Sequence, residues 1–185
     1  SNWKIEINPI HSHANNENVL RDLQPILMDI DSLGNVYFTL GFTASTTNGD
    51  FLWNNTNYGL GNSFPSTKIL KINADGSEGY FTDLTSNGGA LNIDAIDVSD
   101  IGSVYAAGYA MDQQIHCSSG THKGLFILKL NQDGTCSAGS ALIATIDKGG
   151  VPSASLVIND LKLSNNGDYF VTGWFAGELD FGGVG

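Results

Sequence analysis

The chain has 185 residues, and its eight Lys and Arg against nineteen Asp and Glu give a formal net charge of −11. This balance argues against nucleic acid or an anionic membrane as a partner, because binding to either needs clustered cations. No apolar run approaches the roughly 18 residues that a membrane-spanning helix requires, so we expect no membrane insertion.

Strand patterns dominate the chain, and helical periodicity is limited to a short stretch at residues 16–23. Apolar and polar residues alternate around Met28, Ile96 and Leu161, which predicts three strands that each bury one face. A five-residue turn follows each strand, with Gly at the position best suited to a positive φ. These turns, at 31–35, 99–103 and 164–168, lead into second strands at 36–42, 104–109 and 169–174.

Two further strands complete the unit in its first two copies. Third strands are predicted at 67–73 and 125–131, and each ends at an Asp-Gly pair, which is a strong hairpin signal. Fourth strands follow at 79–84 and 141–146. In the first copy an extra residue, Leu40, precedes the glycine near the end of the second strand, which predicts a β-bulge there.

The spacing of the turn glycines sets the length of the repeat. Gly34, Gly102 and Gly167 lie 68 and 65 positions apart, so the unit is about 65 residues long. Four antiparallel strands in such a tandem repeat are typical of a β-propeller blade, and we therefore predict an all-β fold of blades. The chain then divides into the end of one blade (1–25), blades at 26–91 and 92–157, and the start of a further blade (158–185).

Propellers close with roughly four to eight blades, so these blades predict only a partial propeller. We expect either a fragment of a longer protein or an assembly subunit. Open strand edges are expected at residues 3–7, which we assign to the preceding blade, and at 169–174. Each edge should pair with the remaining blades of a longer chain or with another copy of the same chain.

The copies approximate a longer pattern, D-x-x-G-N-V-Y-x-T-G followed by K-L-N-x-D-G: residues 31–41 fit its first part with one extra residue and residues 129–134 fit its second part. Residues 172–183 read T-G-W-F-A-G-E-L-D-F-G-G. The pattern resembles the bacterial β-propeller repeat family known as SBBP. Ser103 and Asp168 replace the Asn of that pattern, and the long insert after Phe42 interrupts it. Family members are typically extracellular or cell-surface bacterial proteins, so the resemblance implies that localisation. The segments that carry the match are 31–41, 71–76, 129–134 and 167–173.

No catalytic motif stands out, since the sequence contains neither a G-x-S-x-G elbow nor a phosphate-binding loop. Our leading hypothesis is therefore a non-catalytic extracellular or cell-surface propeller that acts as an interaction or structural scaffold. We expect it to use no cofactor, and a surface protein or a glycan is its expected external partner.

The insert at residues 42–66 suggests an alternative function, carbohydrate binding by a lectin-like propeller. Aromatic rings stack on sugar faces, and amide side chains hydrogen-bond sugar hydroxyls directionally. The competing interpretation is that Trp53 only packs the insert onto its own blade. The candidate ligand-binding residues are Phe51, Trp53, Asn55, Asn57 and Tyr58.

Aspartates are the candidates for metal binding or acid–base chemistry. Asp29 and Asp31 begin like a calcium loop, but Leu33 takes a ligand position and no bidentate Glu follows at the right distance. We expect these carboxylates, with Asp75, Asp94, Asp97 and Asp133, to cap turns, and we expect no metal site. Paired aspartates across a cleft would also suit part of a glycan-processing enzyme, the second alternative function.

Cys117 and Cys136 are the only two cysteines. An even count in a chain of this composition predicts a Cys117–Cys136 disulfide and an oxidising compartment. Two buried free thiols are the alternative.

Overall fold

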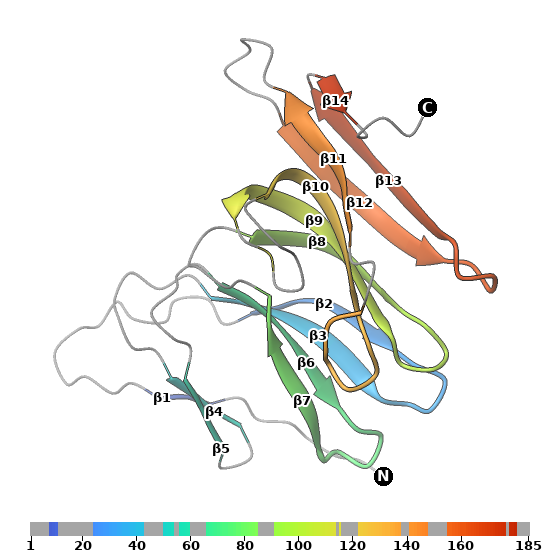
Figure 1. Ribbon diagram of the computed structural model, residues 1–185. Helices are drawn as coiled ribbons and strands as arrows, with labels where there is room; N and C mark the ends of the chain where they lie inside the picture. The colour runs from blue at the N-terminus through green and yellow to red at the C-terminus, as the bar shows by residue number, and fades with distance from the viewer. Residues whose placement is uncertain are drawn as a thin grey trace, which may run out of the picture.

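The computed structural model describes residues 8–10, 24–42, 50–53, 56–59, 66–84, 91–113, 115, 122–137, 141–147, 155–176 and 178–180. In these segments the chain forms antiparallel β-sheets and no helix (Figure 1). The prediction of an all-β fold is therefore confirmed. The strand expected at residues 3–7 and the helical turn at 16–23 lie outside the described residues.

Three sheets carry the repeated units. The first sheet has the order β2-β3-β6-β7, with β2 at Gln24–Ile30, β3 at Val36–Phe42, β6 at Ser66–Ile72 and β7 at Glu78–Asp83. The second has the order β14-β11-β10-β9-β8, with β8 at Leu91–Val98, β9 at Val104–Gln113, β10 at His122–Leu130, β11 at Ala141–Asp147 and β14 at Glu178–Asp180. The third pairs β12 at Ser155–Leu163 with β13 at Tyr169–Ala176.

A small fourth sheet contains part of the insert. Its order is β1-β4-β5, with β1 at Asn8–Ile10, β4 at Asp50–Trp53 and β5 at Thr56–Gly59. Both β4 and β14 follow the second strand of a unit, and both pair with an earlier part of the chain, β4 with β1 and β14 with β11. The four strands predicted for each complete unit are present in the predicted order, and β14 extends the second sheet.

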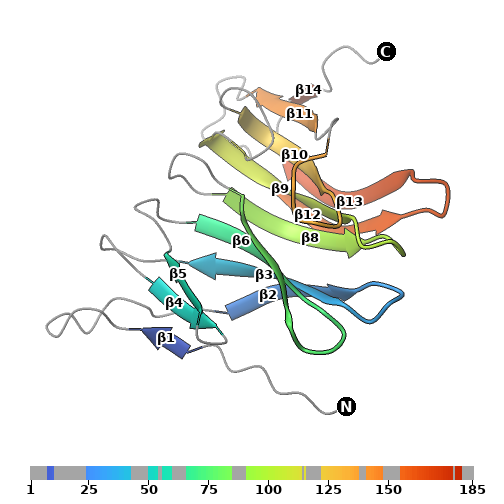
Figure 2. The ribbon, with the colours of Figure 1, turned by 60° about the horizontal axis from the view of Figure 1, so that its bottom comes forward.

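The first, second and third sheets succeed one another in space in their chain order, as Figure 1 and Figure 2 show. Strand β8 packs against β2 on one side and β12 on the other. The sheets of the described segments do not close on one another.

Both faces of the second sheet are buried. Along β10, Phe126 and Leu128 pack with Tyr37 of the first sheet. The alternating residues, Leu125 and Ile127, belong to a second cluster with Ile158 and Leu161 of the third sheet. Since successive strand residues point to opposite faces, this explains why residues 125–128 of β10 form an unbroken apolar run. Each such side chain contributes about 2 kcal/mol by burial.

The β-bulge predicted at Leu40 lies instead on the preceding strand. Strand β3 pairs with β6 without a break, whereas the register of β2 against β3 shifts between Pro25 and Met28. The same shift recurs in β8 and in β12. Leu40 thus occupies the register position of Gly108 in β9 and of Gly173 in β13. The prediction that Leu40 is an extra, bulged residue is therefore wrong, and Gly41 lies one register position beyond these two glycines.

Gly108 is required by the close approach of a neighbouring backbone. It pairs with Ile93 beside the bulge, and a Cβ at Gly108 would lie 1.9 Å from the carbonyl oxygen of Asn92. Gly173 is similar, with the carbonyl oxygen of Val157 at 2.2 Å. By contrast, Gly167 has a φ of 86°, and no atom lies within 4 Å of the position that a Cβ would take there.

We predict that Gly108→Ala destabilises the protein by about 3 kcal/mol, because the new methyl group overlaps backbone atoms that cannot rotate away. Gly167→Ala serves as the control and should cost only about 1 kcal/mol, the penalty of a left-handed backbone. Urea denaturation followed by circular dichroism measures both. Equal losses for the two variants would contradict the assignment of the bulge.

Candidate functional site

The carboxylate of Asp31 organises the first of the repeated turns. Its Oδ1 accepts hydrogen bonds from the backbone amides of Leu33 and Asn35, at 3.0 and 2.9 Å. Its Oδ2 accepts bonds from Asn35 Nδ2 at 2.7 Å and from the Tyr37 hydroxyl at 3.0 Å. Burial opposes ionisation of this carboxyl group, but the hydrogen bonds outweigh burial and lower the pKa of Asp31.

The corresponding turns of the second and third units hold the same backbone shape with weaker side-chain bonds. The amide of the first turn residue donates to the carbonyl of the fifth in all three copies. In the second turn, Ser99 Oγ accepts one bond, from the amide of Ser103 at 3.0 Å. In the third, Ser164 Oγ accepts bonds from the amides of Asn166 and Asp168, at 3.3 and 3.0 Å.

Neighbouring sheets are joined by a carboxylate-to-amide bond that recurs at one repeat position. Asp29 Oδ2 accepts from the backbone amide of Val98 at 2.7 Å, which joins the first sheet to the second. Asp97 Oδ2 accepts from the amide of Leu163 at 2.6 Å, which joins the second to the third. In each case the amide belongs to the first strand of the next unit, and that strand has only one partner in its own sheet.

The joint between the first and second sheets is closed by the second turn. Ser32 Oγ donates to the carbonyl oxygen of Asp100 at 2.7 Å. Gly102 lies so close to Tyr37 that a Cβ there would be 2.6 Å from the Tyr37 hydroxyl. Only glycine fits at this position, because its φ of 84° also disfavours a side chain.

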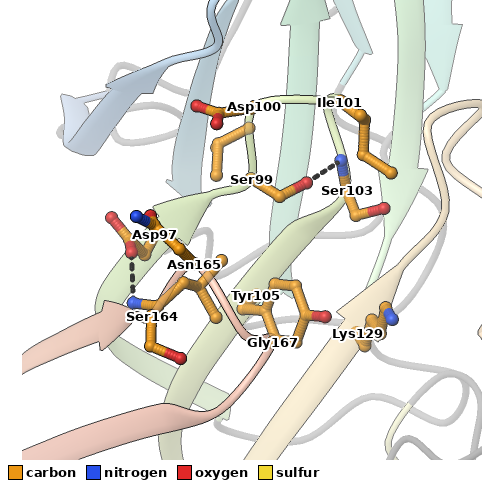
Figure 3. Close-up of a pocket in the computed structure, with 12 residues that line it drawn as sticks. Asp97, Ser99, Asp100, Ile101, Ser103, Tyr105, Lys129, Ser164, Asn165 and Gly167 are labelled. Atoms are coloured by element: carbon orange, nitrogen blue, oxygen red, sulfur yellow. Dashed lines mark hydrogen bonds between the residues drawn. The ribbon is translucent and has the colours of Figure 1, made fainter.

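The joint between the second and third sheets contains a cavity of about 400 Å³. Figure 3 shows the second turn and the Ser164–Gly167 segment facing this cavity, together with Tyr105 and Lys129. Gly167 has no neighbour within 4 Å of a Cβ position, so the third turn makes no contact like that of Gly102 with Tyr37. The second joint therefore has a cavity at the position that the contact between Gly102 and Tyr37 fills in the first joint.

Hydrogen-bonding groups dominate the chemistry of this cavity. Its lining includes Ser99, Ser103 and Ser164, and Lys129 Nζ lies 5.1 Å from the centre of the Tyr105 ring. Neither His nor Cys is among the lining residues. The arrangement is suited to holding polar groups, such as a polypeptide turn or a small hydroxylated molecule.

The aspartates considered as calcium ligands accept hydrogen bonds from backbone amides. The prediction that they cap turns is confirmed for Asp31 and also for Asp75 and Asp133, which accept from the amides of Ser77 and Thr135. The prediction is wrong for Asp29 and Asp97, since each carboxylate joins two sheets instead of capping a turn. It is also wrong for Asp94, which lies within β8 and accepts from the Ile158 amide. Within the described residues no group of three or more His, Cys, Asp or Glu side chains could hold a metal ion.

Four of the five residues predicted to bind carbohydrate lie on the paired strands β4 and β5. Its register pairs Phe51 with Tyr58 and Trp53 with Thr56, while Asn57 pairs with Leu52. Asn57 is therefore out of phase with the Phe51–Tyr58 pair along the strands. Asn55 lies outside the described residues, as do the side chains of the other four. Carbohydrate binding here and the glycan-processing alternative stay predictions.

No cysteine among the described residues is free. Just after β10, the backbone of Cys136 pairs with that of Leu130 in an isolated antiparallel β-bridge. Cys117 lies outside the described residues, so the Cys117–Cys136 disulfide stays a prediction.

The open edge expected at residues 169–174 lies on β13, and the aromatic surface exposed there was not predicted from the sequence. Tyr169, Phe170, Trp174 and Phe175 have 44%, 62%, 52% and 51% of their surface exposed. Among the described strands β13 pairs only with β12. The signal that could have revealed this surface is the sequence of β13, YFVTGWFA, which contains four aromatic residues and no charge.

No family model, curated protein or solved structure matches the chain. The resemblance to the SBBP repeat therefore stays a prediction. No helix among the described residues is long and apolar enough to cross a membrane.

We predict that Asp31→Ser, which installs the residue found at the same position of the second turn, destabilises the protein by about 2 kcal/mol at neutral pH. The loss comes from charge-assisted hydrogen bonds to the turn and to Tyr37. The pKa of Asp31 is lower in the folded state than its unfolded value of about 3.9. Its stabilisation is thus complete above about pH 4 and is lost as the pH falls through the folded pKa.

Urea denaturation of both proteins between about pH 3 and pH 7 measures this effect, and the difference should shrink toward acid. Asp94→Asn is the control of opposite sign, because burial raises the pKa of Asp94 despite a bond from the Ile158 amide. Ionisation of Asp94 destabilises the fold, so relative to wild type this variant should gain stability as the pH rises through that range. A pH-independent loss for Asp31→Ser would contradict the proposed network.

We also predict that Asp97→Ala loosens the third sheet. The substitution removes the acceptor for the Leu163 amide and the ion pair with Lys162, whose Nζ lies 2.8 Å from Asp97 Oδ1. Stability should fall by about 2–3 kcal/mol, and hydrogen exchange at Leu163 should accelerate. Asp100→Ala removes the same charge from an exposed neighbouring residue and should change neither quantity. Unchanged exchange at Leu163 in Asp97→Ala would show that the bond does not hold the sheets together.

Proposed function

We propose that the chain is a segment of an extracellular or cell-surface bacterial β-propeller that acts as a non-catalytic scaffold and holds polypeptide at the open edge of its third sheet. The exposed aromatic edge strand β13 is the observation that carries this proposal. The partner would be the remaining blades of a longer chain or another copy of the same chain.

A propeller arrangement is supported by the equivalence of the two joints. Asp29 and Asp97 occupy the same register position, opposite Tyr37 in the first sheet and opposite Tyr105 in the second. Each accepts a hydrogen bond from a backbone amide of the next unit, one residue after the equivalent position there: Asp29 from Val98, and Asp97 from Leu163. Sheets related by one repeated contact continue in a regular series, as blades do.

An interaction role is supported by the composition of the open edge. Natural sheets protect exposed edges with charged residues, proline or bulges, because unpaired backbone groups recruit other strands. Strand β13 contains no charged residue and no proline, and its aromatic side chains are exposed. Such an edge is suited to pairing with another polypeptide strand.

The extracellular location rests on the resemblance of the repeat to surface-protein repeats and on the predicted disulfide. The net charge of −11 is compatible with a soluble exterior segment and unfavourable for nucleic-acid binding.

We predict that the 185-residue chain associates with itself reversibly through β13 at physiological salt, where repulsion between its net charges is screened. Thr172→Lys places a charge in the middle of this strand and should leave the protein monomeric with an unchanged circular dichroism spectrum. Asn166→Lys adds the same charge in the exposed third turn and should preserve association. Sedimentation velocity over a concentration series measures all three proteins.

The proposal fails if the wild-type chain stays monomeric at the highest accessible concentrations. It also fails if Thr172→Lys and wild type associate equally, because β13 would then not be the interacting edge.

A further inference from the structure

The strand that occupies the open edge of β13 can be specified from the two complete sheets. Strand β3 of the first sheet has β6 on the side away from β2, and β9 of the second has β10 on the side away from β8. In the third sheet, β13 has the position of β3 and β9, since it pairs with β12 as they pair with β2 and β8.

A lysine occupies the same register position in both neighbouring strands. Tyr37 of β3 pairs with Lys71 of β6, and Tyr105 of β9 pairs with Lys129 of β10. The ammonium groups lie over the rings of these tyrosines, 5.5 and 5.1 Å from their centroids. This cation–π contact between adjacent strands is the one side-chain pair that both sheets share at this position.

The residue of β13 at this register position is Phe170. It pairs with Lys162 of β12, just as Tyr37 pairs with Asp29 of β2 and Tyr105 pairs with Asp97 of β8. Phe170 is 62% exposed, so its ring is accessible to a partner. A phenyl ring has no hydroxyl group but keeps the electron-rich face that attracts a cation.

The flanking residues of β6 and β10 define the rest of the pattern. In β6 the flanking apolar residues are fully buried, namely Ile69, Leu70 and Ile72. Their counterparts in β10 are also buried, namely Ile127, Leu128 and Leu130. Both strands then end in Asn and an Asp-Gly turn, whose glycines Gly76 and Gly134 have φ of 86° and 80°. The shared sequence is two apolar residues, Lys, one apolar residue and Asn.

We infer that the open edge of β13 binds an antiparallel strand of the pattern apolar-apolar-Lys-apolar-Asn, with the lysine ammonium group over the ring of Phe170. This inference rests on the proposed function and specifies the chemistry of its partner. The partner strand adds backbone hydrogen bonds along β13, and the lysine fixes its register.

A synthetic peptide with the sequence of residues 66–77 tests the inference, because it contains β6 and the following turn. The peptide is labelled with fluorescein and titrated with the 185-residue chain. Its fluorescence anisotropy should rise and then saturate as the peptide binds. Phe170→Lys in the chain should weaken binding about tenfold, since it replaces cation–π attraction with like-charge repulsion. Phe170→Glu keeps an attraction for the lysine and should bind within about threefold of wild type.

Two variant peptides separate register from general charge attraction to an acidic chain. Lys71→Glu in the peptide should weaken binding to wild type about tenfold and should restore binding to the Phe170→Lys chain. Lys68→Glu makes the same charge change at the position opposite Leu40 in the first sheet, away from Phe170, and should have a smaller effect. Saturation with the unmodified peptide should slow hydrogen exchange in residues 169–176 and leave β7 unchanged.

Equal losses for the two variant peptides, or no restoration by charge reversal, would overturn the inference. The same holds if the peptide does not bind although the chain associates with itself through β13, and in that case the proposed scaffold role stands. A chain that neither associates with itself nor binds the peptide contradicts both this inference and the proposed scaffold role.

Discussion

The arrangement of the three sheets depends on a hydrogen bond between a carboxylate and a backbone amide. The first strand of each unit lies at the edge of its own sheet, where alternate amides have no strand partner. Asp29 and Asp97 each supply an acceptor to such an amide in the next sheet. Both amides are partly buried, so leaving one without an acceptor would cost part of the about 1–3 kcal/mol that a fully buried amide loses. The bond therefore removes this cost and also fixes how far one sheet is displaced along the next.

The two joints differ both in the chemistry of the turns beside them and in how they are filled. At the first joint Asp31 holds the Tyr37 hydroxyl, and Gly102 packs directly on that hydroxyl. At the second joint Ser99 takes the place of Asp31, and the adjacent space is a cavity. The same backbone repeat thus accompanies a closed contact at one joint and an open one at the other.

Much of the fold could be predicted from the sequence because the information is local. Positive φ at Gly34, Gly102 and Gly167 follows from the turn pattern, and alternation of apolar residues gives the strands. The bulge was misplaced because a count of residues before a glycine cannot show which of two paired strands carries the extra residue. That depends on register, and the overlap of Gly108 with the Asn92 carbonyl becomes visible only once β8 and β9 are paired.

The candidate sites were less predictable because they depend on distant segments. Asp29 and Val98 are 69 positions apart, and no local pattern distinguishes a carboxylate that joins sheets from one that caps a turn. The exposure of Phe170 was likewise hidden, since Tyr37 has the same position in the repeat and is fully buried. What separates them is the presence of a neighbouring strand and sheet, which is a property of the assembly.

The inter-sheet bond also gives the stack a direction. Each carboxylate points forward along the chain, to an amide of the following sheet, so the two ends of the series are chemically unlike. The third sheet ends the run of acceptors, because Lys162 stands where Asp29 and Asp97 stand and is itself bonded back to Asp97. Two such stacks cannot meet through this contact by a twofold axis. A head-to-tail contact of this kind would need an acceptor on the third sheet, and Lys162 offers none at that position.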